Sequence, residues 1–134
     1  MKMQITCKSY RIDLIINILF FIFLTVFRSN VAVADPLEAR TALKQMGIEY
    51  TEQQFAISAG AGDMTAIKLF LDAGIDVNAG GGAALGLAAG RGRLEMVKLL
   101  LSKGAKPTSN SLQFARTRGY KDIENILVEA GAKE

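Results

Sequence analysis

Residues 83–105 read AALGLAAGRGRLEMVKLLLSKGA, and this stretch decides the fold. In its second half Met96, Leu99 and Leu100 recur at the i, i+3, i+4 spacing that places side chains on one face of a helix. Its first half is a shorter run rich in Ala and Leu that reaches Gly92, a residue type suited to a tight turn. The stretch therefore predicts two helices joined by a glycine turn.

The longer of these two helices has two further near-copies in the chain. Residues 62–74 read GDMTAIKLFLDAG and residues 119–131 read GYKDIENILVEAG, which align with GRLEMVKLLLSKG at residues 92–104. Each copy ends on a glycine, where a left-handed C-cap favours this residue. A unit of this size cannot bury its own apolar face, so the units must stack. We predict three two-helix repeats, at about residues 51–78, 79–108 and 109–134.

Residues 83–105 resemble the ankyrin repeat, whose pattern is T-P-L-H-x-A-A-x-x-G-H-x-E-x-V-K-x-L-L-x-x-G-A. Residues 74–78 read GIDVN and are similar to the G-A-D-V-N that closes a repeat of that family. The resemblance implies an all-α, ankyrin-like helical repeat solenoid that binds a partner protein through the concave surface of its inner helices.

The chain departs from that pattern at the start of the inner helix, where Ala83, Ala84 and Gly86 replace Thr, Pro and His. The repeats are also shorter than the family length of about 33 residues. The missing residues fall after Asn78 and after Thr108, where the family forms a β-hairpin finger. We therefore expect shortened fingers.

The segment before the first repeat and the third repeat each indicate how the array is closed. Residues 36–47 predict an N-terminal capping helix, because a proline opens the segment and a glycine closes it. In the third repeat Glu124 stands where the other repeats carry Ile67 and Val97. An apolar side chain there would face a following repeat, so we expect that none follows.

The first 34 residues differ from the rest in composition. They begin with basic residues, continue with the uncharged apolar run of residues 14–27, and reach AVA at residues 32–34. The run is shorter than the roughly 20 residues that a membrane-spanning helix needs. We predict a signal peptide over residues 1–34, cleaved after Ala34, and a periplasmic or secreted bacterial domain over the remainder. The alternative is a membrane-tethered accessory subunit that keeps the apolar run as an anchor in the inner membrane.

The charge distribution argues against a nucleic-acid partner. The net charge of +3 lies entirely in the first 34 residues, because residues 35–134 carry twelve acidic and twelve basic side chains. A nucleic-acid-binding domain needs a basic excess that this segment lacks. The aromatic side chains are predicted to be core or cap residues rather than a base-stacking platform: Tyr50, Phe55, Phe70, Phe114 and Tyr120.

Residue types also limit the chemistry. The chain has no His, and its one cysteine, Cys7, lies in the predicted signal peptide. These facts exclude His or Cys zinc sites and nucleophile pairs that depend on His. The run GGGAALG at residues 80–86 follows no predicted strand, which argues against a dinucleotide site. We expect no catalytic residue, no metal and no cofactor; a small-ligand binder or an enzyme is the less favoured alternative.

The candidate binding residues surround the turn glycines. Residues 35–76 carry seven acidic and three basic side chains, whereas residues 77–134 carry five acidic and nine basic ones. In the ankyrin family the two positions before the turn glycine commonly contact partners. The predicted strip, which would meet an acidic surface of an unidentified protein, consists of Ala61, Gly90, Arg91, Arg93, Arg116, Thr117 and Arg118. The alternative is a solvated basic end that serves solubility only. In both cases we expect the chain itself to be a monomer.

Overall fold

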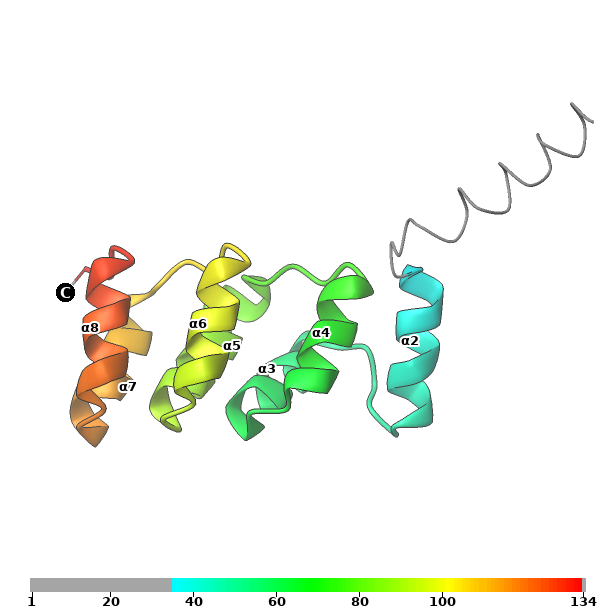
Figure 1. The fold of residues 1–134 in the computed structure, drawn as a ribbon, viewed down its shortest axis with the longest axis horizontal. Helices are drawn as coiled ribbons and strands as arrows, with labels where there is room; N and C mark the ends of the chain where they lie inside the picture. The colour runs from blue at the N-terminus through cyan, green and yellow to red at the C-terminus, as the bar shows by residue number, and fades with distance from the viewer. Residues whose placement is uncertain (1–34, 134) are drawn as a thin grey trace, which may run out of the picture. The chain divides into compact units, whose positions relative to one another are not determined.

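The computed structural model describes residues 35–133. This part of the chain contains seven helices and no strand (Figure 1). The helices are α2 (Pro36–Gln45), α3 (Glu52–Ala61), α4 (Met64–Asp72), α5 (Ala79–Gly90), α6 (Leu94–Ser102), α7 (Ser109–Arg118) and α8 (Lys121–Glu129). The predicted all-α repeat fold is confirmed. The predicted signal peptide and its cleavage point lie outside the described residues.

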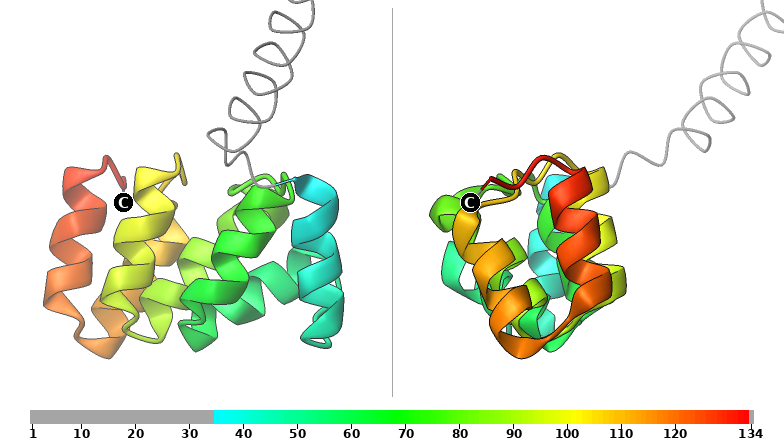
Figure 2. Two further views of the ribbon diagram at one scale, coloured as in Figure 1. Left: turned by 45° about the vertical axis from the view of Figure 1, so that its right-hand side comes forward. Right: turned by 90° about the vertical axis from the view of Figure 1, so that its left-hand side faces the viewer.

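The helices form two rows. Viewed along the stack, α4, α6 and α8 lie on one side and α3, α5 and α7 on the other (Figure 2, right). We call α3, α5 and α7 the inner helices, or inner row, and α4, α6 and α8 the outer helices, or outer row. Each inner helix packs on its neighbours in the row and on the outer helix of its own repeat, while α2 packs on α4. Between residues 35 and 133, no helix combines the length and the apolar character that crossing a membrane requires.

Local signals start and stop these helices. The side chains of Asp35, Thr51, Asp63 and Thr108 accept hydrogen bonds from backbone N–H groups in the first turns of α2, α3, α4 and α7. Such N-caps each stabilise a helix by about 1 kcal/mol. At the other end of α3, Gly62 adopts a left-handed C-cap with φ 84°. That conformation turns the chain into α4 at little cost only because glycine has no Cβ.

The core runs between the two rows through all the repeats. In the first repeat the rings of Phe55 and Phe70 meet edge to face with centroids 5.5 Å apart, and the Tyr50 ring stacks on Phe70 at 5.8 Å. Large side chains under 2% exposed continue this layer: Leu43, Ile67, Leu85, Met96, Val97, Leu100, Leu112 and Leu127. Stacking thus buries apolar side chains that a single repeat could not bury by itself.

One aromatic prediction is wrong. Phe114 is 49% exposed, so it is a surface residue and not a core residue. Its neighbours on α7 that point into the stack are Leu112 and Ala115, both buried. We predicted a core or cap role for Phe114 because it occupies a repeat-equivalent position, but that position faces away from the outer row.

The first turn of α5, an irregular loop of residues 79–82, takes the place of a finger. Gly80, Gly81 and Gly82 have φ values of 62°, 68° and 81°, so three successive residues are left-handed and the regular part of α5 begins after them. The Asn78 side chain joins this loop to the next one: its Nδ2 donates to the Gly104 carbonyl at 3.2 Å, and its Oδ1 accepts from the Lys106 N–H at 2.8 Å.

Candidate functional site

The inner row has one face that no other described helix covers. Ile57, Leu87 and Phe114 occupy equivalent positions in α3, α5 and α7, and we name them the apolar ridge. Ile57 is 41% and Phe114 49% exposed, and Leu87 is half-buried. Most large apolar side chains of so small a domain are buried, so two exposed ones and a half-buried one at equivalent positions make this face a candidate contact surface.

Glycines of the preceding repeat support the ridge. A Cβ added to Gly60 would lie 3.2 Å from Leu87 Cβ, and one added to Gly90 would lie 3.3 Å from Phe114 Cβ. A Cβ on Gly86 would contact the Phe114 ring at 3.9 Å. Because these positions carry no side chain, neighbouring inner helices approach closely, and Leu87 and Phe114 each rest on the inner helix before their own.

Sequence reasoning missed the ridge as a binding feature. The signal was present, because Ile57, Leu87 and Phe114 are apolar at matching positions, each directly before a small residue. Spacing along one helix could not show that the outer row contacts the neighbouring positions instead.

The predicted arginines have different surroundings. Arg91 lies over α3, since its Nη1 would be 3.1 Å from a Cβ on Gly60. Arg93 Nε donates to the Gly60 carbonyl at 3.3 Å, which joins the second repeat to the first. Arg118 is exposed, and within residues 35–133 neither it nor Arg91 forms an ion pair. Arg91 and Arg118 therefore present guanidinium groups at the turn side of the ridge.

Arg116 belongs to a separate charged cluster. Its Nε donates to Glu124 Oε1 at 2.8 Å, and Lys121 Nζ donates to Glu124 Oε2 at 3.0 Å. These two hydrogen bonds, from Arg116 first and Lys121 second, hold the pKa of the Glu124 carboxyl below its usual value. Arg116 is thus already engaged by Glu124, which it shares with Lys121.

The remaining predicted positions differ in accessibility. Ala61 and Thr117 are exposed at the ends of α3 and α7, and the Thr117 hydroxyl donates to the Gln113 carbonyl at 2.8 Å. Gly90 is buried under Phe114. Of the seven predicted residues, the structure places Arg91 and Arg118 in equivalent positions beside the apolar ridge.

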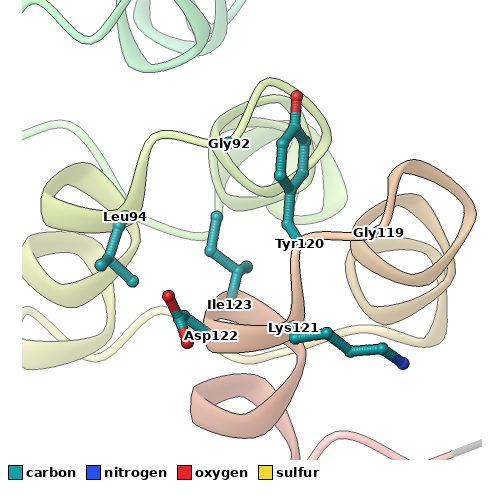
Figure 3. Close-up of a pocket in the computed structure, with 7 residues that line it drawn as sticks. All are labelled: Gly92, Leu94, Gly119, Tyr120, Lys121, Asp122 and Ile123. Atoms are coloured by element: carbon teal, nitrogen blue, oxygen red, sulfur yellow. The ribbon is translucent and has the colours of Figure 1, made fainter.

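Several shallow hollows lie between the repeats, and two of them adjoin α7. One, of about 400 Å³, is found at the turn from α7 to α8, where the Tyr120 ring stands beside Gly92 (Figure 3). The other, of about 350 Å³, lies at the start of α5 and includes Gly81, Gly82, Gly86 and Phe114 in its lining. Within residues 35–133 no group of acidic, His or Cys side chains is arranged to hold a metal ion.

Comparisons with known proteins agree with this architecture. The family model described as ankyrin repeats (3 copies) matches residues 42–111. A relative from Treponema pallidum (strain Nichols), named as ankyrin repeat-containing, is 32% identical over 104 residues, which cover 70% of this chain. The alignment covers 35% of that relative, so this chain spans about a third of its length. No solved structure gives a significant match.

Ankyrin repeats are generally protein–protein interaction modules, and the family is typically non-catalytic. The matched region begins within α2 and extends into α7, so it includes the greater part of both rows. Because the match covers just over half of the chain, this protein belongs to the ankyrin repeat family.

Proposed function

We propose that this protein is a non-catalytic binding module that holds a partner protein on the open face of its inner helices. The observation that carries the proposal is the apolar ridge, with one exposed or half-buried apolar side chain in each repeat. Water contact with such side chains is unfavourable, and a partner that covered them would remove that cost.

The surroundings of the ridge suit binding. Leu87 and Phe114 rest on glycines of the preceding inner helix, so this part of the surface is formed before a partner arrives and loses little entropy on docking. Apolar residues at the centre of an interface commonly supply most of the affinity, with charged residues at the rim. Arg91 and Arg118 occupy that rim, where positive charge favours an acidic partner surface.

The test compares two exposed apolar residues with opposite locations. Phe114 on α7 and Val128 on α8 are each 49% exposed, but only Phe114 belongs to the ridge. We expect Phe114→Asp to abolish crosslinking to a partner in the native compartment, and Val128→Asp to leave it intact. Far-UV circular dichroism and thermal melting check that both variants fold. Equal crosslinking by both folded variants would contradict the proposal.

We also propose that the module acts outside the cytoplasm, in a periplasm or in the medium. The support is the sequence of residues 1–34, with its basic start, apolar run and AVA motif. Intact mass spectrometry of the chain recovered from a bacterial host tests it, because cleavage after Ala34 removes 34 residues. A full-length mass in the membrane fraction would instead favour the tethered subunit anchored by residues 14–27.

A further inference from the structure

We infer that the partner presents a short linear segment that combines an apolar side chain with a carboxylate, the first held in the hollow at the start of α5 and the second by Arg118. This inference rests on the proposed function and specifies which chemistry the open face recognises. It follows from the lining of the hollow beside Phe114 and from the unmatched positive charge of Arg118 on the same helix.

The hollow exists because the finger is missing and glycines replace it. Gly80, Gly81 and Gly82 are left-handed, and a Cβ on Gly81 would meet nothing within 4 Å. We name this hollow the glycine hollow. Its volume is about 350 Å³, and backbone and small side chains form much of its lining. No charged side chain is part of its lining.

Phe114 and Leu87 form the apolar wall of the glycine hollow. The Phe114 ring covers Gly86, and about half of the residue's surface is free to contact a partner. An apolar pocket with an aromatic wall is the usual place for the buried anchor residue of an interface. A hollow of this size accommodates a single side chain, such as Leu or Phe, rather than a folded surface.

The charge requirement comes from the same helix. Arg118 follows Asn110, which also lines the glycine hollow, by eight residues on α7. At a helical rise of 1.5 Å per residue, the two positions are about 12 Å apart along the helix axis. Arg118 has no ion-pair partner between residues 35 and 133, and its position at the C-terminal end of α7 is one where a helix favours positive charge.

These positions define a spacing in the partner. An extended chain advances about 3.3 Å per residue, so 12 Å corresponds to three or four residues. A segment that runs along α7 would place an apolar side chain in the glycine hollow and an Asp or Glu three or four residues away beside Arg118. Arg91 lies at the equivalent position of the preceding repeat and adds to the positive potential there.

Peptide selection tests the inference directly. Random linear peptides are displayed and selected against the full chain as purified from its host, and the enriched peptides are labelled with fluorescein for polarisation titrations. We expect the enriched sequences to share an apolar residue and an acidic residue separated by three or four positions. Enrichment without an acid, or no enrichment of linear peptides, would overturn the inference.

Two variants with matched controls locate the bound peptide. Ala83 is exposed and lines the glycine hollow, so Ala83→Phe fills the hollow without entering the core; Ala130→Phe makes the same change at the exposed C-cap of α8. We expect Ala83→Phe to weaken peptide binding by at least about tenfold, the usual effect at an interface anchor, and Ala130→Phe to leave it unchanged. Equal affinities for the two variants would overturn the inference.

The charge is tested in the same titration. Arg118→Glu and Lys68→Glu alter the net charge equally, but Lys68 lies on the outer helix α4. We expect only Arg118→Glu to weaken binding, and the difference to shrink at high salt because ions screen exposed charges. Loss of affinity in Phe114→Asp without loss in Ala83→Phe or Arg118→Glu would refute this inference and leave the proposed function intact. No loss in any of the three would refute both.

Discussion

The two outermost parts of the described stack are closed in different ways. On the N-terminal side α2 packs on α4, Leu43 is fully buried, and the Tyr50 ring stacks on Phe70. On the C-terminal side Glu124 binds Arg116 and Lys121 at the surface. The first arrangement buries apolar area, which stabilises strongly, whereas the second places exposed ion pairs, which stabilise weakly. We therefore expect substitutions on the N-terminal side to lower the free energy of unfolding more than substitutions on the C-terminal side.

The largest expected effect breaks the aromatic cluster of the N-terminal side. Phe70 is fully buried and contacts the rings of both Tyr50 and Phe55. Phe70→Ala should lower the free energy of unfolding by about 3–5 kcal/mol, because it removes a large side chain and leaves a cavity. Urea denaturation followed by circular dichroism measures the change. Val128→Ala, at an exposed position, is the control; a similar loss there would show that the cluster is unimportant.

The second largest loss of stability is expected at the junction of the last two repeats. Gly92 has φ 69°, and an added Cβ would lie 2.8 Å from the Tyr120 ring. Gly92→Ala should destabilise by roughly 1–3 kcal/mol, from left-handed strain and displacement of the ring. In a Tyr120→Ala background, Gly92→Ala should lower the free energy of unfolding only by the amount of the backbone strain, because the ring is absent. Additive thermal shifts in the double variant would show that the ring contact contributes nothing.

A smaller effect separates hydrogen bonding from ring packing on the N-terminal side. The Tyr50 hydroxyl donates to the Ala73 carbonyl at 3.1 Å in a partly buried position. Tyr50→Phe keeps the stacked ring and should cost about 1 kcal/mol. Tyr120→Phe is the matched control, because that hydroxyl has no hydrogen bond to residues 35–133. Equal unfolding free energies for the two variants would show that Tyr50 stabilises the N-terminal side through the packing of its ring alone.

The smallest expected effect concerns the charged side and its pH dependence. The pKa of Glu124 is lowered by Arg116 and Lys121, so its carboxylate stabilises the folded chain above the usual glutamate pKa. That contribution disappears as pH falls through the lowered value. Wild type should therefore exceed Glu124→Gln in stability at neutral pH, and the difference should vanish in acid. Glu129→Gln removes a charge from the same helix without an ion pair between residues 35 and 133. A pH-independent difference for Glu124→Gln would contradict the assignment.

The all-α helical repeat fold was predictable from the sequence because local rules determine its helices and turns. Helical spacing around Met96 and Leu100 indicates a buried face, and both residues are buried. Glycine marks the left-handed turn at Gly62 before any neighbour is known, since only the backbone conformation matters there. Agreement between such local preferences and the stack is what makes a repeat sequence recognisable.

The open face, in contrast, depends on which helix packs against which. Its repeat-equivalent position predicted a core or cap role for Phe114, and only the packing of the two rows leaves its side chain exposed on the open face. Arg116 and Arg118 look alike in sequence, yet the fold brings Glu124 to the first and not to the second. The sequence by itself determined helices, turns and the need to stack, because these follow from contacts between residues close in the chain. The tertiary structure decided which apolar side chains and which charges remain for a partner, because those depend on contacts between repeats.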